Sequence, residues 1–173
     1  MRLRRLLAFA IDWCCMLAWV GLVAAVGVPL YALGVLNLSD ALAQNLVGLS
    51  VVVPIVLAAA RCESHPRAAT VGKRVLRLTV EHDGGRPTFT LALLRNTLKL
   101  GTPWIVAHAA VFAVVDSSAQ GATPAWAMWL LLGAYVLPVV WVVSLLLPGG
   151  QTLYDRLSST RVASPKATIA AER

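Results

Sequence analysis

The sequence predicts an all-α membrane protein: a four-helix transmembrane bundle with a cytoplasmic β-hairpin and an interfacial amphipathic helix between the second and third spans. Of its 173 residues, 58% are hydrophobic and only 13% are charged, whereas soluble domains carry about 25% charged residues. A soluble fold of this length cannot bury so much apolar surface. The fifteen Lys and Arg residues fall in three blocks that the apolar runs separate, which is the distribution that membrane insertion produces.

Four apolar runs approach or exceed the roughly 20 residues that a helix needs to cross the hydrocarbon core. The first is longer than a span requires, and Pro29 can end or kink it. Pro54 lies inside the second run, while Gly101 and Pro103 interrupt the start of the third, which makes it the weakest. The fourth is clean apart from Pro138. We expect the spans at residues 6–36, 41–60, 98–115 and 125–147.

The amino terminus needs a separate test, because basic residues followed by apolar ones also begin a signal peptide. The apolar run from Trp13 to Leu36 exceeds a signal core of about 7–15 residues. Asp12 also interrupts the start of this run. A retained first span is therefore the expectation, and Ala24-Ala25, a weak cleavage-like site, keeps cleavage open as the alternative.

The basic residues predict the orientation of the chain. Segments 37–40 and 116–124 contain no Lys or Arg, whereas the amino terminus, the central loop and the carboxyl tail contain all of them. Positively charged loops stay cytoplasmic, so both termini and the central loop are expected inside. A nucleic-acid-binding domain would instead spread its basic residues over a water-facing surface. We therefore expect this charge to meet anionic lipid headgroups and not nucleic acid.

The long central loop, residues 61–90, is predicted to contain structure of its own. Apolar and polar residues alternate over Leu76–Glu81, which is typical of a half-buried strand. Asp83–Gly85 supplies a tight turn, and a short return strand is expected over Arg86–Phe89, where a proline confines it to an edge. Leucines mixed with basic and amide residues over Phe89–Leu100 predict an amphipathic helix at the membrane interface.

Asp12 is the main candidate for a functional residue. It lies about 10 Å beyond Arg5 along the first helix, at roughly 1.5 Å per residue. A carboxylate at the bilayer centre costs about 2.5–3.5 kcal/mol on insertion scales. Asp12 lies nearer the interface, yet it still needs a partner, water or a proton. Two interpretations stay open: an ion or proton site facing the bundle interior, or a buried contact that pairs the first helix with Arg5 or with another helix.

Asp155 follows the fourth span directly. Acidic residues are scarce on the expected cytoplasmic face, so one interpretation places Asp155 near Arg5. The other is a helix cap or a solvated pair with Arg156, which the spacing alone favours.

The central loop also contains a candidate binding surface. Thr70–Arg74 superficially resembles a phosphate loop, but that motif needs glycine where Arg67 stands and Ser or Thr where Arg74 stands. ATP binding is therefore not expected. We expect instead a basic loop that faces lipid headgroups or a protein partner. Its residues are Lys73, Arg74, Arg77, Arg95 and Lys99.

Other chemistry finds little support. His108 stands alone in the third predicted span, Cys14 and Cys15 are adjacent in an apolar run, and Cys62 has no spaced partner. These patterns offer no Ser/His/Asp set, no paired carboxylates and no metal-ligand cluster. We expect neither an enzyme, nor a cofactor, nor a metal site.

Several short motifs together resemble the RDD family of membrane proteins, which is named for one arginine and two aspartates. The matching segments are Arg5–Asp12, Gly72–Arg74, Asp83-Gly84, Leu93–Asn96 and Gln151–Arg156. Each is short, but they follow the family's order over nearly the whole chain. Where the family often has histidine, this chain has Tyr154.

The resemblance implies a triad of Arg5, Asp12 and Asp155, with an ionic or structural role. It also implies a transmembrane domain over residues 1–163, followed by a flexible cytoplasmic tail over 164–173. The expected location is the bacterial cytoplasmic (inner) membrane, as a multi-pass protein with both termini inside. The family's function is mostly unassigned; ligand transport has been suggested, and some members are associated with sodium/proton exchange.

Two functional hypotheses follow. The first is a small transporter or cation/proton exchanger, a homo-oligomer in which Asp12 alternates between protonated and cation-bound states. The second is a non-catalytic membrane scaffold or accessory subunit, in which the triad fastens the first helix to the carboxyl tail. In the second, the basic loop binds lipid or a protein partner.

Overall fold

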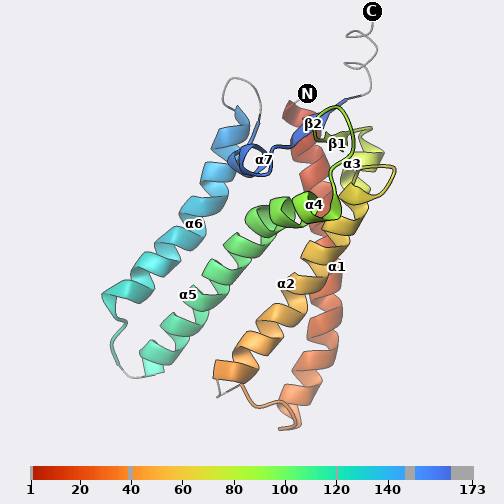
Figure 1. Cartoon of the computed structure of the whole chain (residues 1–173). Helices are drawn as coiled ribbons and strands as arrows, with labels where there is room; N and C mark the ends of the chain where they lie inside the picture. Colours follow the sequence, from red (N-terminus) through yellow and green to blue (C-terminus); the bar gives the residue numbers. More distant parts are fainter. Residues whose placement is uncertain (1, 39–40, 120, 147–150, 165–173) are drawn as a thin grey trace, which may run out of the picture.

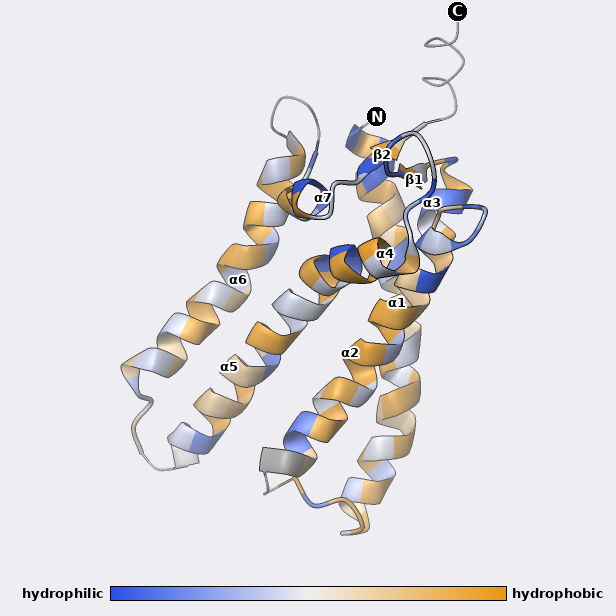
Figure 2. Ribbon diagram, in the orientation of Figure 1, coloured by the Kyte–Doolittle hydropathy of each residue, from blue (hydrophilic) through white to orange (hydrophobic). Residues whose placement is uncertain are grey.

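Four long helices dominate the computed structural model, which describes residues 2–38, 41–119, 121–146 and 151–164. All four are long and apolar enough to cross a membrane, and Figure 2 shows their mostly hydrophobic colouring. The prediction of four such helices is confirmed; their orientation stays a prediction. The helices are α1 (Arg2–Ala32), α2 (Ala41–Ser64), α5 (Thr102–Ala119) and α6 (Ala125–Leu146).

The helix ends differ from the predicted spans, and two of these differences affect the residues of the polar network. α1 already begins at Arg2, so Arg5 lies on a regular helix with a fixed direction relative to Asp12. α2 continues past Ala60 to Ser64. A helix can continue into polar residues where tertiary contacts support it. The predicted spans were based on apolar runs, so they covered only the apolar part of each helix. The extension matters because it places Glu63 on a rigid helix.

The third helical run is bent. α4 (Phe89–Asn96) passes through the π-helical turn η1 (Thr97–Gly101) into α5 without a break in the helix, and Figure 1 shows α4 turned across the direction of α5. The bend directly precedes Pro103, which has no N–H to donate to the carbonyl of Lys99 and whose ring crowds that carbonyl. The predicted amphipathic segment is thus helical; its place at a membrane interface stays a prediction.

A two-stranded antiparallel sheet lies beside these helices. β1 (Thr79–Glu81) pairs with β2 (Arg161–Ala163), with Val80 opposite Val162. The predicted turn is present, because His82 and Gly85 exchange backbone hydrogen bonds of 2.8 and 2.9 Å.

The second strand differs from the expected return strand. Residues 86–88 have no regular structure and Phe89 already belongs to α4, so the edge of β1 is covered by a segment near the end of the chain. Pro87 is fully buried and cannot donate to a strand ladder. β2 supplies three pairing residues and buries Val162 against Leu78 and Ala8.

One end of the bundle gathers the polar elements, and we call it the polar end. It comprises the start of α1, the end of α2, α4, both strands and the short helices α3 (Val71–Val75) and α7 (Leu153–Leu157). Figures 1 and 2 show these elements together, with the hydrophilic colouring concentrated there. The first and last parts of the described chain therefore meet at the same end of the bundle.

Candidate functional site

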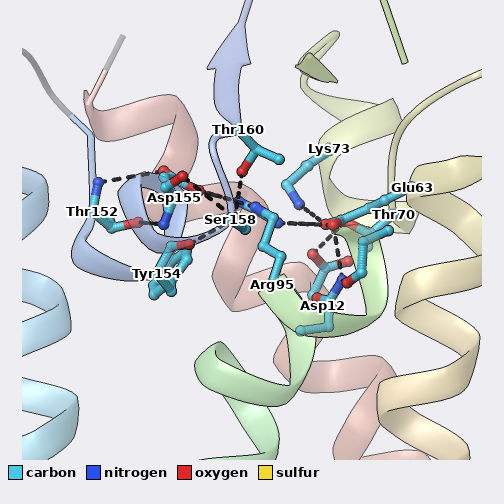
Figure 3. A network of polar contacts seen from close by, with 12 residues as sticks. Asp12, Glu63, Thr70, Lys73, Arg95, Thr152, Tyr154, Asp155, Ser158 and Thr160 are labelled. Atoms are coloured by element: carbon cyan, nitrogen blue, oxygen red, sulfur yellow. Dashed lines mark hydrogen bonds and ion pairs between the residues drawn. The ribbon is translucent and has the colours of Figure 1, made fainter. Parts of the chain in front are cut away.

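Arg95 is the centre of a buried charge network at the polar end. It lies in the last turn of α4, with 1% of its surface exposed. Its Nε and Nη2 donate to Oδ1 of Asp155 at 2.9 and 2.7 Å, and its Nη1 donates to both oxygens of Glu63 at 2.7 and 2.9 Å (Figure 3). A planar guanidinium suits such a bridge, because its donors form a rigid fork that matches carboxylates. Arg95 thus joins two buried carboxylates from distant parts of the chain.

Glu63 is the second centre of the network, and its side chain is fully buried near the end of α2. In addition to Arg95, it accepts from Nζ of Lys73, on α3, and from Nδ2 of Asn96 at 2.8 Å. A buried carboxylate is tolerated only when its oxygens are satisfied in this way. Sequence reasoning did not single out Glu63. The available signal was an acid three residues after the end of the second apolar run, within a block of basic residues.

Asp155 combines two roles that the sequence left as alternatives. Its carboxylate accepts from Nη2 of Arg5 at 2.6 Å, and it also forms a capping box with Thr152 at the start of α7. The helix begins there because Thr152 accepts from the Asp155 amide while Oδ2 of Asp155 accepts from the Thr152 amide. Asp155 therefore fixes α7 to both α1 and α4.

Asp12 bonds with a different part of the structure. Its Oδ2 accepts from Oγ1 of Thr70 at 2.7 Å, and its Oδ1 accepts from the amide of Gly72 at 2.8 Å. Asp12 thus satisfies free donors at the start of α3, as a helix cap supplied by another helix. The backbones are close, since a Cβ on Gly72 would lie 2.0 Å from the carbonyl oxygen of Ala8.

Of the three residues of the predicted triad, the structure joins two in one contact. Arg5 and Asp155 form an ion pair, while Asp12 accepts hydrogen bonds from Thr70 and Gly72. All three lie at the polar end, and together they connect α1 to α3 and to α7.

The five residues of the predicted basic loop are divided between interior and surface. Lys73, Arg95 and Lys99 are buried, the first two in the ion pairs with Glu63. Arg74 and Arg77 have exposed side chains. Of the five, only Arg74 and Arg77 are therefore exposed enough to contact headgroups or a protein partner.

Burial and ion pairing set the charge states of the network outside the long helices. Burial is the largest effect on Lys73 and lowers its pKa to about 8, although Glu63 opposes this. Burial raises the pKa of Asp155, but Arg95 and Arg5 outweigh it and hold this pKa below its ordinary value. Asp155 is therefore ionised at neutral pH, as its ion pairs require.

A groove of about 470 Å³ runs beside the network, between α1, α2, α5 and α6. Its walls are apolar and include Trp13, Val52 and Trp141. At the polar end the walls become charged. The charged lining residues are Arg5, Asp12, Lys73, Arg95 and Lys99.

His108 has a packing role. Its Nε2 lies 3.1 Å from the backbone oxygen of Gln44, and its ring lies against Gly48, where a Cβ would be 2.5 Å from Nε2. Trp104 donates to the backbone oxygen of Gly48 at 3.2 Å. These contacts join α5 to α2, and a single hydrogen-bonded histidine of this kind needs no proton relay to explain it.

Comparison with known proteins supports the resemblance seen in the motifs. A family model described as the RDD family matches residues 2–158. No curated protein and no solved structure matches the chain. The matched range includes Arg5, Asp12, Glu63, Arg95 and Asp155.

Proposed function

Since this chain belongs to the RDD family, we propose that it acts as a non-catalytic scaffold or accessory subunit of the bacterial cytoplasmic membrane, with both termini inside. The long apolar helices anchor the protein, and the polar end is a rigid platform for a cytoplasmic protein partner. The observation that supports this proposal is the buried bridge from Glu63 through Arg95 to Asp155.

The network favours a fixed platform because its buried carboxylates already have partners. Glu63 accepts from Arg95, Lys73 and Asn96, and Asp155 accepts from Arg95 and Arg5. Removing one member of such a cluster leaves an uncompensated buried charge. An exchanger, by contrast, must bind and release an ion in each transport cycle. Its carboxylate must therefore give up its hydrogen-bond and ion-pair partners with little loss of free energy.

Asp12 is likewise committed to a structural contact. Both of its oxygens accept hydrogen bonds, one from a hydroxyl group and one from a backbone amide. A cation bound at Asp12 would compete with these two donors, which lie at the start of α3.

The exposed part of the polar end then offers the docking surface. Arg74 and Arg77 are exposed on and after α3, which Asp12 and Glu63 hold in place through Gly72 and Lys73. A fixed pair of cations suits an acidic surface on a partner protein, since exposed charges contribute mostly specificity and association rate.

A cation/proton exchanger, working as a homo-oligomer, is the second candidate. One observation favours it: Asp12 lines the groove that α1 shares with the other long helices. In this alternative the groove admits the cation and Asp12 binds it, while a second copy completes the pathway.

Proteoliposome flux distinguishes the two candidates. Sodium uptake driven by a pH gradient is compared for the wild type, Asp12→Asn, and the control Asp116→Asn, whose carboxylate is exposed near the far end of α5. We expect wild-type flux at the level of empty liposomes, together with a lower melting temperature for Asp12→Asn alone. Wild-type flux that Asp12→Asn abolishes and Asp116→Asn retains would establish the exchanger and reject the scaffold.

The platform itself is tested in native membranes. A photo-crosslinking amino acid at position 77, on the exposed part of the polar end, should give one reproducible crosslinked protein. The same amino acid at position 118, at the opposite end of the bundle, is the control. Equal crosslinking patterns from the two positions would contradict a docking surface at the polar end.

A further inference from the structure

Lys99, in η1 directly after α4, is a buried cation that the ion pairs of the described residues do not use. Its residue surface is 9% exposed, and its ammonium lies 5.0 Å from the centre of the Phe9 ring. Within the described part of the chain it makes no hydrogen bond and no ion pair, in contrast to Lys73 and Arg95. The carboxylates of Glu63, Asp12 and Asp155 act on its charge from beyond ion-pair distance, so its own hydrogen-bond donors stay unused among the described residues. Lys99 is therefore placed to receive an anion.

The charges around Lys99 leave room for an anion. Among the described residues, the network and the charged end of the groove contain four basic and three acidic side chains, so with every group ionised one positive charge is in excess. The cations are Arg5, Lys73, Arg95 and Lys99, and the carboxylates are Asp12, Glu63 and Asp155. The excess lies in a buried setting where charges are weakly screened. A ligand with one negative charge would balance it.

The groove that Lys99 lines has the shape and chemistry of a site for an amphiphile. Its volume of about 470 Å³ lies within the roughly 300–1,000 Å³ that is usual for small-molecule sites. Away from the charged end the walls are side chains such as Met16, Val52, Leu145 and Trp141. Nε1 of Trp141 is buried without a hydrogen-bond partner in the described structure. The walls thus suit an acyl chain, and the charged end suits an acidic headgroup.

We propose that this groove binds an anionic phospholipid, with its phosphate at Lys99 and one acyl chain along the apolar walls between α1 and α6. A phospholipid fits better than a soluble anion, because the apolar walls belong to helices whose outer faces are themselves apolar and exposed. The hydrocarbon of the bilayer is then continuous with the groove. The proposal concerns a site separate from the exposed Arg74 and Arg77, and it does not depend on the scaffold role.

Lipid binding can be measured with the purified full-length chain in a mild neutral detergent. Phosphatidylglycerol with brominated acyl chains quenches tryptophan fluorescence on contact, and Trp13, Trp104 and Trp141 all line the groove. We expect saturable quenching by brominated phosphatidylglycerol, and binding about tenfold weaker for brominated phosphatidylcholine, whose net charge is zero. Equal affinity for the two lipids would overturn the proposed headgroup site.

Lys99→Gln is the matched test, and Arg86→Gln, which removes an exposed charge, is its control. Lys99→Gln should weaken phosphatidylglycerol binding about tenfold, through loss of a charge-assisted contact to phosphate, and leave phosphatidylcholine binding unchanged. Arg86→Gln should change neither. An equal loss in both variants would indicate general surface attraction and overturn the proposal.

Melting temperatures separate a ligand site from a structural residue. In detergent without lipid, Lys99→Gln should keep or raise the melting temperature, because it removes a buried ammonium that makes no hydrogen bond or ion pair among the described residues. A lower melting temperature for Lys99→Gln, with unchanged lipid binding, would make Lys99 structural and reject the proposal.

A second variant keeps Lys99 and fills the groove. Ala134 lines the groove from α6, and Ala134→Phe should weaken the binding of both lipids while the exposed charges stay unchanged. Unaltered lipid binding in Ala134→Phe would overturn the proposed location. Loss of a concentration-dependent dimer in this variant, without wild-type lipid quenching, would instead assign the groove to a second copy of the chain.

Discussion

Arg95 donates two hydrogen bonds to a single oxygen of Asp155, at 2.9 and 2.7 Å. This contact joins α4, which precedes the third long helix, to α7, which follows the fourth. The remaining nitrogen of the same guanidinium reaches Glu63 at the end of α2. Arg95, and not Arg5, is therefore the residue through which the polar end is held together, and it is the first residue to test.

Arg95→Gln should strongly destabilise the protein. Glutamine cannot bridge Glu63 and Asp155, so two buried carboxylates lose their main counter-charge. Breaking a buried ion pair by removing one partner costs about 3–5 kcal/mol. Thermal denaturation of the purified variant and of the wild type in detergent measures the loss of stability. Arg77→Gln, at an exposed position, is the control and should stay within about 0.5 kcal/mol of the wild type; equal losses would contradict the central role of Arg95.

Gly72→Ala should disrupt the contact between α1 and α3. The new Cβ would lie 2.0 Å from the carbonyl oxygen of Ala8. Both atoms are fixed to helix backbone, so the clash can be relieved only by moving α1 and α3 apart. Gly21→Ala is the matched control, since its Cβ would meet nothing within 4 Å. It should be neutral or stabilising by about 0.5–1 kcal/mol, as for a glycine inside a helix. A melting temperature for Gly72→Ala equal to that of Gly21→Ala would refute the close packing.

Acid should weaken the polar end through Asp155. Its pKa is lowered in the folded protein from the ordinary 3.8, so the unfolded chain binds the proton more readily. The stabilisation is complete above the unfolded pKa and is lost as the pH falls below 3.8 toward the folded value. Melting temperatures between about pH 5 and pH 2 check this. Asp155→Asn should have a lower melting temperature than the wild type at pH 5, and its melting temperature should fall less steeply as the pH is lowered. An equally steep fall in the variant would contradict the role of Asp155.

The orientation can be tested by cysteine labelling in intact cells. In a chain whose three native cysteines are replaced by alanine, Ser118→Cys should react with a membrane-impermeant maleimide, since segment 116–124 lacks basic residues. Arg77→Cys should react only after the cells are permeabilised. Labelling of both positions from the same side would contradict the predicted topology and, with it, a cytoplasmic polar end.

The structure pairs Arg5 with Asp155, two members of the triad that the family resemblance implied. Spacing favoured a cap for Asp155, and the structure contains both the cap and the ion pair with Arg5. The two interpretations are compatible because a carboxylate has two oxygens, each with more than one acceptor site. Asp12 was recognised as unusual from its position in an apolar run, but nothing near it in the sequence pointed to Thr70 or Gly72.

The apolar character of the four long helices and the turn at Asp83–Gly85 were determined by the sequence alone. Hydrophobic transfer adds up residue by residue along a segment, and a tight turn depends on the residues within it, so neighbouring positions contain the information. The tertiary structure decided which groups meet: β2 in place of the expected return strand, Glu63 as a centre of the network, and Lys99 turned into the groove. Ion pairs and strand partners join distant positions, and only the folded geometry brings their atoms within reach.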